Sequence, residues 1–206
     1  MKNPTLIILI VILFTTAFCS IEKSPKKYDV VIYGGTSAGI SAAIQTSRMD
    51  KSVLLIEPSQ RLGGLTTGGL GATDIGNKQA IGGISREFYQ KIKKYYDAPA
   101  NWNWQNPEDY QQSRNVEKQD AMWTFEPSAA IEVYKEMMAP ETIDLISGER
   151  LNRRDGVKKH GARILEIEME NGNAYRGKMF IDATYEGDLM STAGVSYSVG
   201  RESNSE

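Results

Sequence analysis

The sequence predicts an α/β fold built on a strand–turn–helix–strand (βαβ) unit close to its amino-terminal end. Three observations predict it: an apolar run that stops at glycines, a helical pattern of small and aliphatic residues behind them, and a second apolar run closed by an acid. The connection between the two strands is expected to be right-handed. A chain of 206 residues can bury a sizeable core around such a unit.

Residues 1–20 are interpreted as a secretory signal peptide, followed by a linker over 21–27. One lysine precedes an apolar core from Leu6 to Phe14, and small residues follow. The stretch is short for a transmembrane helix, which needs about 20 apolar residues. We therefore expect an exported protein, periplasmic or secreted. An uncleaved anchor and a lipoprotein acylated at Cys19, the only cysteine, stay open as alternatives.

The βαβ unit is expected to begin at Tyr28, where the run YDVVIY predicts a short buried strand that ends at glycine. A helix is predicted from Ser37 to about Met49, with its aliphatic residues on one face. The run KSVLLIEP, residues 51–58, predicts the second strand, which Glu57 and Pro58 close.

The spacing of the glycines between strand and helix is typical of a nucleotide-binding turn. Gly34 permits a sharp exit from the strand, and Gly39 permits close packing of helix on strand. The helix N-terminus offers free N–H groups to a pyrophosphate. Thr36 stands where the fingerprint usually has a second glycine, so its side chain must either point away from the phosphates or donate to one. Glu57, 18 residues after Gly39, is placed to bind ribose hydroxyls.

Glu57 also bears on which dinucleotide binds. A carboxylate repels a 2′-phosphate, which leaves NAD or FAD. The following stretch, residues 57–76, is rich in glycine, and a flavin needs backbone close to its ribityl chain and ring edge. The alternative is a flexible surface loop. The sequence therefore favours FAD.

Further elements are predicted in order along the rest of the chain. The stretch 82–96 predicts an amphipathic helix, and residues 101–127 predict a long ordered excursion in which Trp102 and Trp104 either contact a sugar ring or seal a cap. A helix is expected over 128–138. Alternating apolar and polar residues over 142–184, broken by turns, predict a small antiparallel meander that feeds a buried strand. A short helix is expected from Asp188 to Ala193.

Five blocks of the sequence resemble, in order, exported bacterial FAD-dependent oxidoreductases, whose two-dinucleotide-binding fold is related to those of glutathione reductase and fumarate reductase. The blocks are DVVIYGGTSAGISAAI, IEPSQRLGGLTTGGLG, GGISREFYQKI, FEPSAAIEVYKEMM and FIDATYEGDLMSTAGVSYSVGRE. They span Tyr28 to Glu202, nearly all of the expected mature chain. Members of this group are sometimes labelled xanthan lyase. The resemblance implies a Rossmann-type FAD-binding domain over 28–206.

The resemblance also implies roles for single residues. The pyrophosphate of FAD would be held by Gly34, Gly35, Ser37, Ala38 and Gly39, with Thr36 in the same turn, and the adenosine ribose by Glu57 beside Pro58. The flavin side would be lined by Arg61, Gly63, Gly64, Leu65 and Thr66. Ala183 and Thr184 match the strand end that returns to the FAD domain, a motif that usually continues with glycine where this chain has Tyr185.

These observations lead to one functional expectation with alternatives. We expect an FAD-dependent oxidoreductase that takes a hydride from a small substrate, carbohydrate-derived in one version of the hypothesis. A flavin-dependent lyase or isomerase and a non-catalytic fragment are the alternatives. Flavoproteins of this fold usually run longer, so the chain is expected to be the N-terminal part of a longer enzyme, with the catalytic residues largely in the remaining part.

Composition excludes other classes of site. The net charge of −2 with interspersed charges gives no basic stripe for nucleic acid, and no membrane partner is expected beyond the N-terminal signal or lipid anchor. One histidine, His160, and one cysteine give no metal cluster and no catalytic triad. Any redox chemistry must therefore come from the cofactor.

Overall fold

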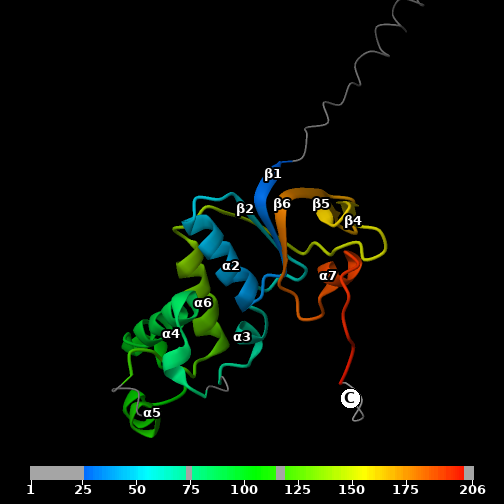
Figure 1. The fold of residues 1–206 in the computed structure, drawn as a ribbon. Coiled ribbons are helices and arrows are strands. Elements are labelled where there is room, and N and C mark those ends of the chain that lie inside the picture. Colours follow the sequence, from blue (N-terminus) through cyan, green and yellow to red (C-terminus); the bar gives the residue numbers. More distant parts are fainter. Residues whose placement is uncertain (1–25, 73–75, 115–118, 202–206) are drawn as a thin grey trace, which may run out of the picture.

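A computed structural model describes residues 26–72, 76–114 and 119–201 (Figure 1). One six-stranded sheet runs through it, in the order β3-β2-β1-β6-β5-β4. The strands are β1 (Lys27–Tyr33), β2 (Val53–Glu57), β3 (Ile143–Ser147), β4 (Val157–His160), β5 (Arg163–Glu168) and β6 (Ala174–Asp182). The helices are α2 (Ser37–Arg48), α3 (Gly64–Gly68), α4 (Gly83–Tyr95), α5 (Pro107–Arg114), α6 (Pro127–Met138) and α7 (Asp188–Thr192), with 3₁₀ turns at Lys78–Ala80 and Pro99–Asn101.

The sheet confirms the predicted α/β class and the βαβ unit. Strand β1 pairs in parallel with β2 on one side and with β6 on the other. Strand β3 extends the parallel part beyond β2. Strands β4, β5 and β6 form the antiparallel meander. The first strand is thus central, and its carboxyl end is where the turn into α2 begins.

Two apolar clusters hold the sheet. One packs α2, α4 and α6 against one face, on the same side of the ribbon in Figure 1, and contains Ile32, Ile40, Ile44 and Phe88. The other lies on the opposite face, around Tyr33, Ile56 and Ile167. All five residues of β2 are buried, as expected for a parallel strand covered on both faces. The turn after β1 is therefore anchored on a rigid core.

The predicted antiparallel meander over 142–184 is smaller than expected. Its first strand, β3, pairs in parallel with β2 at the far edge of the sheet. Alternation of apolar and polar residues reports a half-buried strand and carries no information on strand direction, which explains the error. The final strand, β6, is also less buried than predicted, because Met179 is 65% exposed and Ile181 36% exposed.

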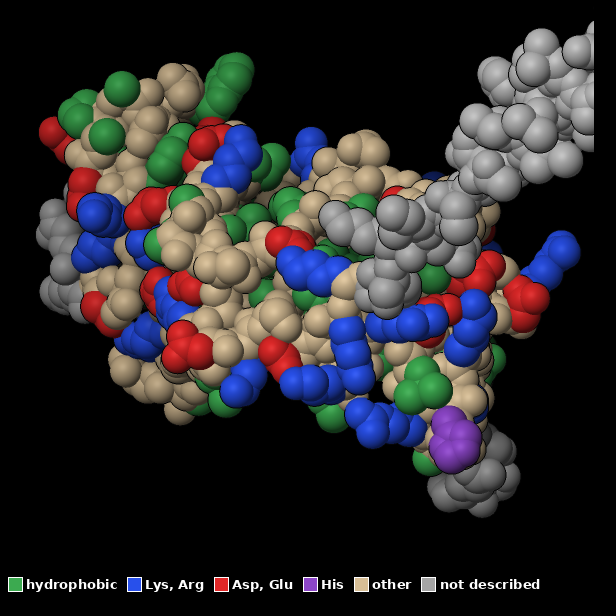
Figure 2. All heavy atoms as spheres, turned by 90° about the horizontal axis from the view of Figure 1, so that it is seen from above, with side chains coloured by type: hydrophobic (Ala, Val, Ile, Leu, Met, Phe, Trp, Pro, Cys, Tyr) green, Lys and Arg blue, Asp and Glu red, His purple; other side chains and the backbone are tan. Residues whose placement is uncertain are grey.

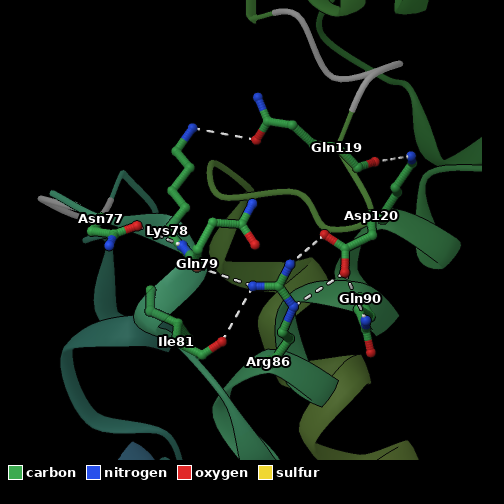
Figure 3. A network of polar contacts seen from close by, with 9 residues as sticks. Asn77, Lys78, Gln79, Ile81, Arg86, Gln90, Gln119 and Asp120 are labelled. Atoms are coloured by element: carbon green, nitrogen blue, oxygen red, sulfur yellow. Dashed lines mark hydrogen bonds and ion pairs between the residues drawn. The ribbon is translucent and has the colours of Figure 1, made fainter.

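The excursion between α4 and α6 contains a helix, α5, which was not predicted, and its return is fixed on α4 by polar contacts (Figure 3). Arg86 donates to both carboxylate oxygens of Asp120, at 2.6 and 3.1 Å. Its guanidinium also donates to the carbonyl oxygens of Lys78 and Ile81, at 3.0 and 3.2 Å. One side chain therefore ties the 3₁₀ turn before α4 and the end of the excursion to the same helix.

A carboxylate in the meander makes stability depend on pH. Glu166 is 5% exposed and accepts from Lys158 at 2.7 Å and from Arg176 at 2.5 Å. Burial raises the pKa of Glu166, but the two cations outweigh burial and hold this pKa below its ordinary value of 4.5. The stabilisation is therefore complete above pH 4.5 and is lost as the pH falls through the lowered pKa.

We expect Glu166→Gln to lower the free energy of unfolding by about 1 kcal/mol at neutral pH, because both cations are half-exposed. The difference from wild type should shrink below pH 4.5, measured by urea unfolding across the pH range. Glu132→Gln, which alters an exposed pair with Lys135, is the control and should change little. A difference between wild type and Glu166→Gln that stays constant down to low pH would contradict the assignment.

Candidate functional site

The turn after β1 is built on two close backbone approaches. Gly34 has a φ of +106°, and a Cβ added to it would lie 2.7 Å from the carbonyl carbon of Ala183. A Cβ on Gly39 would lie 1.9 Å from the carbonyl oxygen of Gly34, which no side chain could relieve. The glycine spacing read from the sequence thus corresponds to a turn in which the first residues of α2 pack directly against the backbone of Gly34.

Thr36 is the N-cap of α2, and its side chain is hydrogen-bonded within the protein. Its hydroxyl donates to the carbonyl oxygen of Ala183 at 2.8 Å and accepts from the N–H of Gly39 at 3.4 Å. Of the two expectations for this residue, the geometry agrees with a side chain that points away from a phosphate. The first amides of α2, at Ser37 and Ala38, have no partner within the helix and carry the positive end of its dipole.

Glu57 ends β2 beside this turn, as its spacing predicts. The side chain is 8% exposed. One carboxylate oxygen accepts from the N–H of Gly35 at 2.7 Å, and the other accepts from the N–H of Ser59 at 2.7 Å. A carboxylate has about four acceptor positions, so two of them remain for hydroxyl groups of a ligand. The carboxylate also fixes the turn itself.

Part of the glycine-rich stretch after β2 packs on the turn, while most of its other described residues are exposed. The N–H of Gly63 donates to the carbonyl oxygen of Gly35 at 2.7 Å. Arg61 donates to the carbonyl oxygen of Thr67 at 2.5 Å and so closes the stretch on itself. The stretch contains the short helix α3, which was not predicted. Residues 73–75 of it lie outside the described part of the chain.

Two cavities flank the turn, and neighbouring residues of the turn line different ones. The first has a volume of about 540 Å³ and contains Thr36 in its wall. The second has a volume of about 400 Å³ and contains Ser37. Both volumes are in the range of sites for small molecules and cofactors. The turn therefore separates two hollows that a ligand with two halves and a linker could occupy.

The structure distributes the predicted site residues over these two cavities and the backbone behind them. The first cavity is lined by Gly34, Thr36, Glu57, Pro58, Arg61, Gly64 and Thr184. The second is lined by Ser37, Ala38 and Thr66. Gly35, Gly39, Gly63, Leu65 and Ala183 line neither cavity and act through the backbone contacts described here. The residues expected on the flavin side are divided between the cavities, because Arg61 and Gly64 line the first with Glu57, whereas Thr66 lines the second with Ser37 and Ala38. Their roles toward FAD stay predictions.

Several lining residues were not predicted as site residues. The first cavity also contains Tyr33, Ser59, Arg150, Leu151, Arg153, Glu170, Tyr185, Glu186 and Asp188. The second also contains Ser41, Ile81, Ser85, Phe88, Tyr89 and Tyr134. The Gly-Asp pair at 187–188 is a signal that could have pointed to the first cavity, whereas nothing local in the stretch 149–154 marks Arg150 as part of a site.

Tyr134 lies at the inner end of the second cavity and is 5% exposed. Burial raises the pKa of its hydroxyl to about 12, and contacts with Thr66 and Ser37 oppose that shift. The hydroxyl is therefore protonated at neutral pH and joins the start of α2 to the segment after β2.

The two tryptophans of the excursion differ in environment. Trp102 donates its indole N–H to the carbonyl oxygen of Tyr96 at 2.7 Å and packs on the helical core. Trp104 is 88% exposed. Both line a third cavity of about 260 Å³, which shares no lining residue with the other two.

Other predicted features can be placed only in the described ranges. His160 is exposed at the end of β4, at the edge of the face in Figure 2. Within residues 26–72, 76–114 and 119–201, no group of His, Cys, Asp or Glu could hold a metal ion. None of the helices in these ranges is long and apolar enough to span a membrane. The predicted signal peptide, residues 1–20 with Cys19, lies outside them, so export stays a prediction.

Comparisons with known proteins identify relatives of this arrangement. The family described as "FAD dependent oxidoreductase" matches residues 29–206. The NADH:fumarate oxidoreductase of Klebsiella pneumoniae (strain 342) is 39% identical over 79 residues, which is 35% of this chain. That match covers 8% of the relative, so the chain spans a small part of its length.

Solved structures share the fold at low identity. The L-amino acid deaminase of Proteus vulgaris matches with a TM-score of 0.55 and 16% identity, over 83% of this chain and 51% of that protein. The L-proline dehydrogenase of P. horikoshii matches with a TM-score of 0.52 and 14% identity, over 85% of this chain and 58% of that protein. THI4 of Thermovibrio ammonificans matches with a TM-score of 0.53 and 15% identity, over 95% of this chain and 72% of that protein.

Proposed function

Because this chain belongs to the FAD dependent oxidoreductase family, we propose that residues 28–206 form a domain that binds FAD across the turn between β1 and α2. The observation that carries the proposal is the pair of cavities on either side of this turn. FAD is a dinucleotide with an adenosine half and a flavin half joined by a pyrophosphate. Two hollows separated by a helix N-terminus match that division.

The residues of the first cavity fit the adenosine half. Glu57 presents a rigid, nearly buried carboxylate with free acceptor positions, which suits two ribose hydroxyls. The amides of Ser37 and Ala38 at the start of α2 would hold the pyrophosphate. Arg61 and Arg153 line the same cavity and add positive charge to its wall.

The residues of the second cavity fit the flavin half. Thr66 and Ser37 offer hydroxyl groups, while Phe88, Tyr89 and Tyr134 form an aromatic wall. When bound, FAD supplies the redox chemistry of the family by accepting a hydride from an organic substrate. The contribution of the chain would be to bind the dinucleotide at the N-terminus of α2 and to shield part of the flavin with the aromatic wall of the second cavity.

The substrate is proposed to be a small molecule, with a carbohydrate derivative as the class that the third cavity favours. Trp104 presents an exposed indole there, next to the amide side chains of Asn103 and Gln105. Indole faces stack on the apolar faces of sugar rings, and amides bond their hydroxyl groups. Because this cavity is separate from the first two, it would hold a part of the substrate away from the reacting carbon.

An absorbance spectrum tests the proposed function. We expect the purified chain, reconstituted with FAD and freed of excess cofactor, to keep a flavin spectrum that bleaches under dithionite. Anaerobic addition of reducing sugars should bleach it if the substrate proposal is correct.

The three outcomes of this experiment separate the alternatives. A chain that retains no flavin after reconstitution would contradict the proposal. Retained flavin that dithionite reduces and sugars do not would support FAD binding and leave the substrate proposal without support. A sugar that is converted without any bleaching would instead favour a non-redox lyase or isomerase.

A further inference from the structure

Tyr185 follows Ala183 and Thr184, where the motif usually continues with glycine. Its side chain is 57% exposed, yet it has a fixed partner. The hydroxyl accepts a hydrogen bond from the backbone N–H of Leu65 at 2.7 Å. The side chain therefore crosses from the segment after β6 to the start of α3, between residues 120 positions apart.

Both ends of this crossing are fixed by the fold. At its base, the carboxylate of Asp182 accepts from the N–H of Thr184 at 3.0 Å and from the N–H of Met190 at 2.8 Å. At its tip, a Cβ on Gly64 would lie 2.2 Å from the Tyr185 hydroxyl oxygen, so only glycine leaves room for the crossing. The hydroxyl position is thus set by two separate segments of the backbone.

The hydroxyl still has a proton to donate. A tyrosine hydroxyl both donates and accepts, and that of Tyr185 acts as an acceptor toward Leu65. Among the described residues, no acceptor for its proton is found. Tyr185 lines the first cavity together with Gly34, Thr36 and Arg61. A donor that is held in position, with no acceptor among the described residues, therefore stands in the wall of the first cavity.

We infer that Tyr185 binds the dinucleotide directly, by donating its hydroxyl proton to a phosphate oxygen of FAD. The inference rests on the proposed function. A phosphate is the expected acceptor because Gly34 and Thr36, which share this cavity wall, belong to the turn at the N-terminus of α2, where negative charge is stabilised. Accepting from Leu65 polarises the hydroxyl and strengthens its donation, and a charged acceptor strengthens it further.

The test is equilibrium binding of FAD, ADP and adenosine to the full chain and to Tyr185→Phe. Phenylalanine keeps the ring and removes only the hydroxyl. We expect FAD and ADP to bind about tenfold more weakly, since a hydrogen bond to a charged group is lost, while adenosine binding is unchanged. Tyr197→Phe is the matched control, because Tyr197 is also 57% exposed but does not line the cavity.

The ratio of ADP to adenosine affinity shows whether the Tyr185 hydroxyl contacts the phosphate directly or only holds the neighbouring loop in place. If Tyr185→Phe weakens both ligands equally, the hydroxyl only holds the loop, and the inference is wrong. Unchanged ADP binding in Tyr185→Phe would also overturn the inference. If the wild type still binds FAD in that case, the proposed function stays intact. If the wild type binds neither FAD nor ADP, the proposed function fails and this inference fails with it. Thermal unfolding of the ligand-free variants checks that each is folded.

Discussion

Replacement of Gly39 by valine is expected to abolish FAD binding and to destabilise the chain by about 3 kcal/mol or more. The β-carbon alone would lie 1.9 Å from the carbonyl oxygen of Gly34, and 3.3 Å from the β-carbon of Ala183. The first contact is with backbone, so no rotamer change relieves it. To accept valine, α2 must move away from the turn, and the amides of Ser37 and Ala38 move with it.

The control for this substitution is Gly82→Val. Gly82 precedes α4 with extended backbone, and a Cβ there would meet nothing within 4 Å. This variant should keep FAD affinity and nearly wild-type stability. Fluorescence titration of FAD and urea unfolding are the measurements. FAD retained by Gly39→Val at wild-type affinity would show that the turn is not the binding element.

The second large effect is expected for Glu57→Gln. The substitution keeps the shape of the side chain but replaces one acceptor oxygen by an N–H₂ donor, which then faces the N–H of either Gly35 or Ser59. A buried backbone donor that loses its acceptor costs about 1–3 kcal/mol. We expect the free energy of unfolding to fall by that amount and FAD to bind at least about tenfold more weakly, because ribose acceptors are lost as well.

Glu170→Gln provides the comparison within the same cavity. Glu170 lines the first cavity, is exposed and uses only its backbone N–H in a hydrogen bond, to the carbonyl oxygen of Arg150. Its substitution should leave FAD affinity close to that of the wild type. Equal losses in Glu57→Gln and Glu170→Gln would mean that general negative charge, and not the position of Glu57, governs binding.

The parts of the fold that the sequence predicted well are those specified by neighbours in the chain. Gly34, Gly39 and Glu57 lie within one βαβ unit, so their spacing alone fixes how they meet. The class of the fold follows from the same unit. Burial of β2 was readable from its unbroken apolar run.

The parts that could not be predicted depend on contacts between distant segments. The position of β3 beside β2 and the crossing of Tyr185 to Leu65 each join residues that carry no local signal for one another. Arg150 enters the first cavity because β3 lies at the edge next to β2, which periodicity does not reveal. Helix α3 was missed because GLTTG has the composition of a turn.

The pairing of β1 with β6 has a consequence for how the chain matures. Val31 faces Phe180 in the sheet, and the hydroxyl of Thr36 bonds the carbonyl of Ala183, 147 residues later. Contacts of such sequence separation form slowly, since a long loop must close first. On the ribosome, where synthesis runs from the N-terminus, the turn after β1 therefore lacks its contact with Ala183 until Ala183 has emerged. FAD binding at this turn is therefore expected only after Ala183 has been synthesised.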